Sequence, residues 1–195
     1  SFFLAISSAI IAMFVGTMIA YVVVKVKVKG KSLLEILALL PYSVPGIVLA
    51  IGVILMWSGT FYLNLYNTIW IILIAYIARY VAFAMKSSSA SLEQVHYSLE
   101  EAARSCGATH LESLRDITIA LIRPGMIAGF FLIFLPAMRE LTTSILLYGP
   151  FSRTLGVAIY AINAEGNITQ SAALSGIAIL IIMLGNLALR FVTKD

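Results

Sequence analysis

Long apolar segments are the feature that most constrains how this chain can fold. A helix needs about 20 apolar residues to cross the hydrocarbon core of a bilayer. Five segments approach or exceed this length: 1–24, 33–57, 68–85, 125–148 and 171–192. Of the 195 residues, 61% are hydrophobic and 11% are charged, which leaves too few polar groups to cover a water-soluble domain. We therefore predict an all-α integral membrane protein, a polytopic helical bundle of about five transmembrane helices.

The basic residues are divided unevenly between the two sides that these segments define. Ten of them fall on one side: Lys25, Lys27, Lys29, Lys31, Lys86, Arg104, Arg115, Arg123, Arg190 and Lys194. Only Arg139 and Arg153 fall on the other side. Because cytoplasmic loops carry the excess of Lys and Arg, we predict that the lysine-rich loop, the long loop 86–124 and the C-terminus are cytoplasmic. Residue 1 then begins outside, and the odd number of spans predicts that a preceding helix or half is absent from this chain.

Prolines interrupt two of the apolar segments. Pro41 and Pro45 lie within the second segment, and Pro136 lies within the fourth. A proline removes a backbone donor and frees a carbonyl, which in a membrane must be satisfied by protein or by a watery cavity. Two interpretations are open at this point. The breaks form a substrate pathway or gate, or they are ordinary kinks in helices packed within a bundle.

Polar residues near these breaks, together with the prolines, are candidates for the pathway or gate. The set consists of Pro41, Tyr42, Pro45, Arg79, Arg139 and Glu140. An ionisable residue inside a span is a functional candidate by default, but Arg79 could instead extend toward the cytoplasmic interface. Arg139 and Glu140 could pair with each other or with neighbouring helices, or they could form an outward-facing gate.

The long loop 86–124 carries the signals of a short helix. Ser98 and Glu101 have the spacing of a capping box, which predicts a helix over 99–106 that stops at Gly107. One apolar stripe of this helix consists of Leu99, Ala102, Ala103 and Cys106. Because an isolated helix of this length is unstable in water, the stripe is expected to pack against the rest of the protein or against another subunit.

A second capping box in the same loop is formed by Thr109 and Glu112. It predicts another helix, whose apolar face consists of Leu111, Leu114, Thr118 and Leu121. The loop is therefore expected to contain a short helix, a tight turn and a longer helix that returns to the membrane.

The histidines and the cysteine do not form a catalytic or metal-binding pattern. His96 and His110 are the only histidines, Cys106 is the only cysteine, and no further ligands cluster near them. The sequence also has no glycine-rich phosphate-binding loop of the GxxxxGK[ST] type. We therefore predict that this chain is not an enzyme and holds no metal, and that it does not bind nucleic acid.

Glu101, Ala102 and Ala103, followed by Gly107 and Ile117, have a long and specific spacing. It resembles the EAA loop of binding-protein-dependent ABC transporter permeases, the MetI-like inner-membrane components. In that family the loop forms a coupling helix that docks into a groove of the cytoplasmic ATPase. The family pattern usually closes with Leu-Pro, and the different residues at 119 and 120 predict a more continuous second helix.

The resemblance implies a set of ATPase-docking residues: Ser98, Leu99, Glu100, Glu101, Ala102, Ala103, Arg104 and Gly107. Glu101 would form an ion pair with an arginine of the ATPase, or it would only complete its own capping box. Gly107 would shape the end of the docking helix, or it would serve only as a helix stop.

The resemblance also implies the rest of the assembly. The chain would be a single permease domain over 1–195, located in the bacterial cytoplasmic membrane and surrounded by lipid. Its partners would be two ABC ATPase subunits, a second permease unit (an identical copy or a fused half) and an extracytoplasmic substrate-binding protein. ATP and Mg would bind to the ATPase, and no cofactor is expected in this chain.

The substrate is indicated by looser similarity. The stretches 40–46, 78–80 and 139–141 most resemble the iron(III) branch of the family, so we expect ferric iron. Thiamine, polyamines, phosphonates and oxyanions are alternatives within the same architecture. An alternative of another class is a secondary transporter or a channel without an ATPase, because broken helices also occur in secondary transporters.

Overall fold

The computed structural model describes residues 1–58 and 64–192, and Lys194 of the predicted cytoplasmic set lies outside them. The described residues are mostly helical and contain no strand, only an isolated bridge between Ser58 and Asn64. Four helices are long and apolar enough to cross a membrane, and a bent helix pair brings the number to five if it counts as one span. The predicted all-α membrane fold is confirmed.

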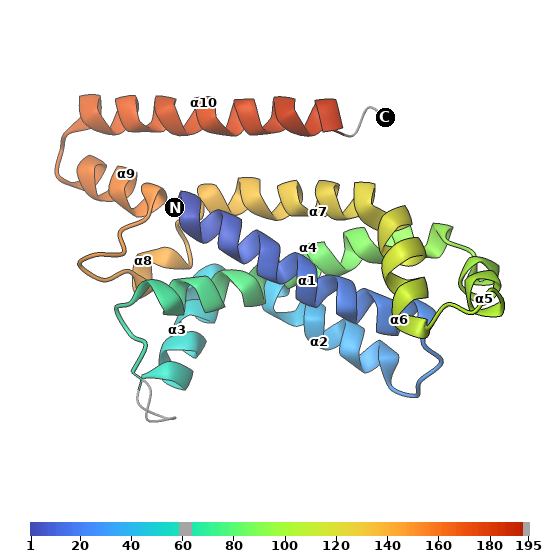
Figure 1. Cartoon of the computed structure of the whole chain (residues 1–195). Coiled ribbons are helices and arrows are strands. Elements are labelled where there is room, and N and C mark those ends of the chain that lie inside the picture. The colour runs from blue at the N-terminus through green and yellow to red at the C-terminus, as the bar shows by residue number, and fades with distance from the viewer. Residues whose placement is uncertain (59–63, 193–195) are drawn as a thin grey trace.

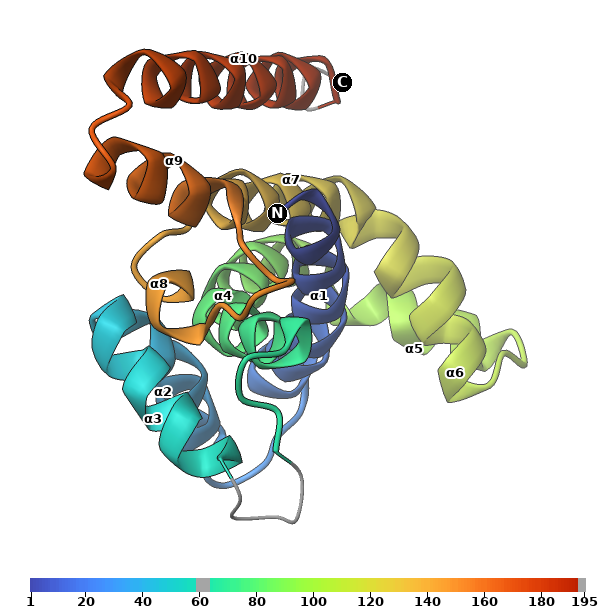
Figure 2. The same cartoon turned by 90° about the vertical axis from the view of Figure 1, so that its left-hand side faces the viewer.

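Three long helices form the centre of the bundle (Figures 1 and 2). They are α1 (Phe2–Lys25), α4 (Ile69–Gln94) and α7 (Ala120–Met138). Glycines allow them to approach closely. A side chain at Gly16 of α1 would collide with Ala84 of α4, and one at Gly129 of α7 would collide with Met13 of α1.

The helix α4 extends well beyond its predicted end at residue 85 and reaches Gln94. Its serine-rich last turns are held by the neighbouring helices. Ser87 donates to the carbonyl of Gly125 in α7 at 2.8 Å, and Ser88 shares a 2.8 Å hydrogen bond with Thr17 of α1. These polar contacts explain why α4 continues through serine residues that are less hydrophobic than the rest of the span.

The fourth span ends at Met138 rather than at residue 148, which corrects the predicted limit. Pro136 lies inside α7 and does not interrupt it. The chain turns after Met138 because the Glu140 side chain accepts a 3.0 Å hydrogen bond from the backbone N–H of Thr143. The prediction placed the break at Pro136 followed by Arg139 and Glu140; the turn lies at the glutamate and not at the proline.

The second apolar segment is a pair of helices, α2 (Lys31–Ser43) and α3 (Gly46–Trp57). Their directions differ by 109°, so the interpretation as an ordinary kinked helix is wrong for this segment. The break lies at Val44 and Pro45, where Pro45 is the N-cap of α3. Pro41 lies inside α2 and does not break it.

The segment after α7 forms two short helices and a long one. They are α8 (Ser144–Leu147), α9 (Leu155–Ala164) and α10 (Ile168–Val192). In both views α10 runs beside α7 at the edge of the molecule (Figures 1 and 2). Only 11% of the apolar stretch of α10 is buried. Most of its surface is thus available to lipid or to another protein chain.

The two ends of the bundle differ in their connections (Figure 1). The loop after α1, the helices between α4 and α7, and the C-terminal end of α10 lie at one end. The N-terminus, α8 and α9 lie at the other. The three regions that carry the basic residues therefore share one end of the molecule, as the charge asymmetry predicted, and we call it the cytoplasmic end.

Candidate functional site

The short helix of the long loop is α5 (Tyr97–Ser105), at the cytoplasmic end. Its N-cap is His96, whose ring nitrogen Nδ1 accepts from the backbone N–H of Ser98 at 3.2 Å. The predicted capping box of Ser98 and Glu101 is therefore wrong, and Glu101 is not needed for capping. The helix begins two residues earlier than expected because His96, two residues before Ser98, supplies the acceptor.

The end of α5 follows the prediction. Gly107 adopts a φ of 94°, a left-handed conformation that L side chains rarely take. Thr109 and Glu112 then form both hydrogen bonds of the second capping box. This box begins α6 (His110–Ser113), which continues without a break through the π-helical η1 (Leu114–Ile119) into α7. The predicted continuous second helix is confirmed.

The apolar stripe of α5 is largely uncovered. Leu99 is 43% exposed, Ala102 and Cys106 are exposed, and Ala103 is half-buried. Within the described part of the chain, the side chain of Glu101 forms no ion pair or hydrogen bond. Since small side chains and an unpaired carboxylate face outward together, this face can receive a closely fitting, positively charged partner.

Glu100 points into the protein, away from the exposed stripe of α5. It therefore does not belong to the exposed docking face for which it was predicted. Its side chain is 8% exposed. One carboxylate oxygen accepts a 2.8 Å hydrogen bond from Thr118 of η1 and lies 3.9 Å from Nζ of Lys25 at the end of α1. The other oxygen accepts from the Tyr21 hydroxyl at 3.4 Å. Because these bonds direct the carboxylate into the protein, Glu100 fixes α5 instead of presenting it.

The face of the second helix also differs from the prediction. Leu111 is 73% exposed and Leu121 is 51% exposed, whereas Thr118 and Ile122 are buried. The π-helical turn of η1 inserts one residue into the helical repeat and rotates the following residues. The regular 3.6-residue spacing used for the prediction does not hold across it.

A second polar cluster surrounds Glu140, at the end of α7 opposite to α5. Its oxygen Oε2 accepts a 2.6 Å hydrogen bond from the hydroxyl of Tyr80 in α4 and lies 3.9 Å from Nε of Arg79. Its oxygen Oε1 accepts from the Thr142 hydroxyl at 2.6 Å and from the Thr143 backbone at 3.0 Å. Burial by itself raises the pKa of Glu140, but these donors and Arg79 outweigh burial and hold the pKa below its usual value.

Arg79 connects this cluster to the break between α2 and α3. Its guanidinium donates to the freed carbonyl of Val44 at 3.3 Å and lies 6.0 Å from the ring centre of Tyr42. The interpretation that Arg79 extends toward the cytoplasmic interface is therefore wrong. The partly buried Arg79 instead satisfies the backbone group that the break exposes, as a membrane interior requires.

The structure thus brings together part of the predicted pathway set. Tyr42, Arg79 and Glu140 lie around the break, which ends at Pro45. Arg139 does not join them: it is exposed and lines a separate hollow with residues of α9 and α10. Glu140 pairs with Arg79 across helices rather than with its neighbour Arg139.

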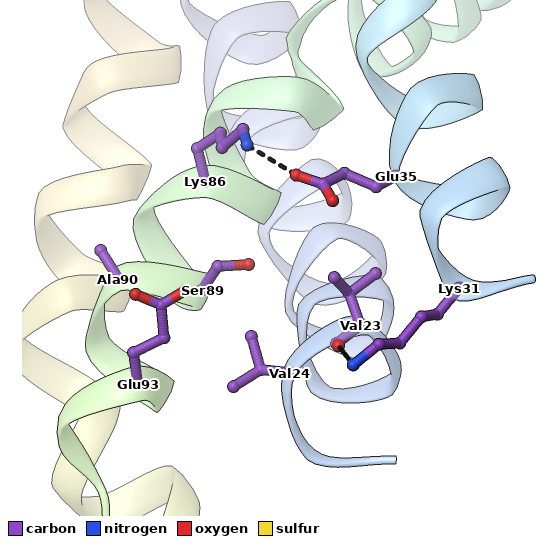
Figure 3. Close-up of a pocket in the computed structure, with 8 residues that line it drawn as sticks. All are labelled: Val23, Val24, Lys31, Glu35, Lys86, Ser89, Ala90 and Glu93. Atoms are coloured by element: carbon purple, nitrogen blue, oxygen red, sulfur yellow. Dashed lines mark hydrogen bonds and ion pairs between the residues drawn. The ribbon is translucent and has the colours of Figure 1, made fainter. Parts of the chain in front are cut away.

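A pocket of about 460 Å³ lies between α1, α2 and α4 near the cytoplasmic end (Figure 3). Lys86 of α4 and Glu35 of α2 reach toward each other across it and form a 2.7 Å ion pair. Lys31 of α2 donates to the carbonyl of Val23 in α1 at 2.9 Å. These contacts join α2 to α4 and to α1, so the charged residues at this pocket hold three helices together. Among the described residues, no group of three or more His, Cys, Asp and Glu could hold a metal ion.

A known family matches almost the whole chain. The family described as "Binding-protein-dependent transport system inner membrane component" matches residues 9–194. The chain belongs to this family. It is therefore the permease component of a transport system and not an enzyme, and it is a multi-pass protein of the inner membrane.

Individual relatives of this permease act on different substrates. The 2-aminoethylphosphonate transport system permease protein PhnV of Salmonella paratyphi A is 29% identical over 96% of this chain and 70% of its own length. The Fe(3+)-transport system permease protein FbpB 2 of Haemophilus influenzae is 33% identical over 80% of this chain and 30% of its own length. The inward-facing MetNI methionine ABC transporter has the same fold, with a TM-score of 0.77 over 98% of this chain and 92% of that chain at 14% identity.

Sequence reasoning missed several residues around the two glutamates of this permease. Lys25 was assigned to a cytoplasmic loop and Thr118 to an apolar face. Tyr80 was considered only as a possible phenol donor or a membrane-interface residue, and Tyr21 was assigned to no site. The one available signal was Lys25, a lysine placed in the last turn of an otherwise apolar span. Such a lysine is a candidate partner for a carboxylate of another loop at the same end, here the long loop 86–124.

Proposed function

We propose that this permease works in an ATP-driven importer and that α5 is the helix on which the ATPase docks. The observation that carries the proposal is the orientation of α5. Its back face is fixed by Glu100, while its small-residue stripe and Glu101 remain open at the cytoplasmic end. A helix fixed on one side and open on the other is suited to receive a force from a partner.

The assembly follows from this surface. Two ATPase subunits bind the α5 helices of two permease units, which are identical copies or fused halves and enclose the pathway. The exposed face of α10 offers apolar surface for the second unit. An extracytoplasmic binding protein delivers substrate at the end that carries α8 and α9. ATP and Mg are bound by the ATPase.

ATP binding drives transport by a population shift. The nucleotide must favour the outward-open state through contacts that differ between the two states. Closure of the two ATPases moves the α5 helices, and the helices of the permease follow. The polar break between α2 and α3, with Arg79, Tyr42 and Glu140, is the proposed pathway or gate, because charged side chains and a bent backbone meet there.

The docking role is tested by two substitutions on α5. Glu101→Lys reverses the exposed charge, and Gly107→Pro removes the left-handed turn at the helix end. Both variants should insert into the membrane normally and should lose most of the co-purifying ATPase. Wild-type amounts of complex and wild-type transport in both variants would contradict the docking role. Full transport by the chain without any ATPase would favour a secondary transporter or a channel.

For the substrate, we propose ferric iron. The support is the 33% identity to the Haemophilus Fe(3+)-transport system permease, together with the stretches of sequence around Tyr42, Arg79 and Glu140. A phosphonate such as 2-aminoethylphosphonate is the second candidate, because the similarity to PhnV extends over 96% of the chain.

The substrate is decided in proteoliposomes that contain the complete transporter. ATP hydrolysis is measured with the binding protein empty, loaded with Fe³⁺, or offered 2-aminoethylphosphonate. Stimulation by the Fe³⁺-loaded form alone would support iron. Stimulation by the phosphonate alone would replace iron with the second candidate, and stimulation by neither would discard both while leaving the importer in place.

A further inference from the structure

We propose that Glu100 is the positioning residue that joins α5 to the membrane-spanning helices, so that movement of α5 reaches α1 directly and α7 through η1. This inference rests on the proposed function, in which the ATPase binds the exposed face of α5. It concerns the opposite, buried face of the same helix and assigns the joint to three residues: Glu100, Lys25 and Thr118.

The carboxylate of Glu100 is the point where three elements meet. Thr118 of η1 donates to it at 2.8 Å, Lys25 at the end of α1 lies 3.9 Å away, and Tyr21 of α1 donates at 3.4 Å. The side chains of Glu100 and Lys25 are 8% and 3% exposed. A buried charge pair keeps one arrangement because every alternative leaves a charge unpaired in a medium of low polarity.

Lys25 also fixes the approach to α5. Its ammonium group donates to the carbonyl of Val95, the last residue before the N-cap of α5, and lies 4.8 Å from the ring centre of Tyr97. On the other side, Ser113 donates to the backbone carbonyl of Glu100 at 3.5 Å. The beginning and the middle of α5 are thus held by α1 and by the helix that becomes α7.

The π-helical turn η1 serves this joint. Ser113 and Thr118 are five residues apart, and in a regular α-helix they would point about 140° away from each other. The i→i+5 repeat of a π-helix brings such residues onto one face. Both side chains then contact Glu100, one at the backbone and one at the carboxylate. This placement explains why the helix departs from regular geometry beside α5.

For transport, the consequence is that α5 is rigidly connected to the membrane-spanning helices. The outward face of α5 is free to bind, and the inward face is bonded to α1 directly and to α7 through η1. A displacement of α5 by the ATPase therefore displaces both helices. If the joint is loosened, the ATPase should still bind and hydrolyse ATP, but the membrane helices should no longer respond.

The joint itself is tested on the full chain in nanodiscs by amide hydrogen exchange over residues 97–105. Glu100→Gln and Thr118→Val should each raise exchange about tenfold, because a buried group loses its partner and local opening becomes easier. Thr118→Ser keeps the hydroxyl and should exchange like the wild type. Lys86→Met, which removes an exposed ion pair elsewhere at the same end, is the control. Wild-type exchange in both Glu100→Gln and Thr118→Val would overturn the joint.

The transmission role is tested in the complete transporter. Thr118→Val should retain the ATPase and its basal ATP hydrolysis but should lose the stimulation by loaded binding protein and transport itself. Thr118→Ser should restore both. Wild-type stimulation and transport in Thr118→Val would overturn this inference and leave the proposed function intact. A wild-type complex that contains no ATPase would instead remove the proposed function, and the transmission role with it.

Discussion

Two glutamates, the buried Glu100 and the partly buried Glu140, lie at opposite ends of this permease, and they are stabilised in different ways. Glu100, at the cytoplasmic end, depends on a lysine that is 3% exposed, on a short hydrogen bond from Thr118 and on a longer one from Tyr21. Glu140, at the other end, has hydrogen bonds from Tyr80, Thr142 and Thr143 in addition to an arginine that is 16% exposed.

The difference indicates different roles. The one cation beside Glu100 is the buried Lys25, so loss of this contact leaves the carboxylate without a compensating charge, as expected of a fixed joint. The charge of Glu140 is shared among several donors on α4 and on the turn after α7. Such a carboxylate can lose one donor and keep the others, which is suited to a region where helices move relative to each other.

Removal of the lysine partner of Glu100 should have the largest effect. Lys25→Met leaves a buried carboxylate without its cation, which costs about 3–5 kcal/mol when one member of a buried pair is removed. The free energy of unfolding of the purified permease in detergent measures the cost. A loss below 1 kcal/mol would mean that the two clusters do not differ in the way proposed here.

A smaller loss is expected at the Glu140 cluster. Tyr80→Phe removes the 2.6 Å hydrogen bond to Glu140 but leaves the donors of Thr142 and Thr143 in place. The expected cost is about 1–2 kcal/mol. Tyr160→Phe, at a tyrosine that is 52% exposed, is the matched control and should be neutral. A cost at Tyr80 equal to that of Lys25→Met would remove the contrast between the clusters.

The Glu140 cluster should also give the permease an acid-sensitive contribution to stability. Since the pKa of Glu140 is lower in the folded than in the unfolded protein, its contribution is fully present above the usual value of 4.5. It is lost as the pH falls below 4.5 through the folded pKa. Unfolding measured from neutral pH downward should show a steeper loss in the wild type than in Glu140→Gln. Parallel curves for the two proteins would contradict the assignment.

The smallest effect is expected at the ion pair of Glu35 and Lys86. Their 2.7 Å contact is shorter than that of Lys25 and Glu100, but the side chains are 35% and 56% exposed. Exposed pairs contribute about 0–1 kcal/mol, so Lys86→Met should change the unfolding free energy within that range. An effect as large as that of Lys25→Met would mean that burial does not govern the strength of these contacts.

Much of this architecture could be predicted from residue patterns. The apolar runs predicted the spans, the lysines and arginines predicted which ends share a side, and the spacing from Glu101 to Ile117 predicted the family. Each of these signals depends on neighbouring residues or on a count of residues along the chain, and none depends on which distant residues come into contact. The left-handed turn at Gly107 was predicted for the same reason, because a helix that stops at a glycine has few alternatives.

The errors arose where distant residues decide the structure. The inward orientation of Glu100 depends on Lys25 and Thr118, and the turn that ends α7 depends on hydrogen bonds to Glu140. The π-helical turn changes which residues face the protein, and this change cannot be predicted from a regular 3.6-residue spacing. Arg79 finds its partners at the break between α2 and α3, far away in the sequence.

If the open stripe of α5 receives the ATPase, a large side chain at Ala102 must block the contact and a small one must not. The co-expressed ABC ATPase is quantified in complexes purified with the wild type, Ala102→Ser and Ala102→Trp. We predict equal ATPase content for the wild type and the small serine variant, and loss of ATPase and transport for the tryptophan variant. Wild-type ATPase content and transport in Ala102→Trp would contradict the account.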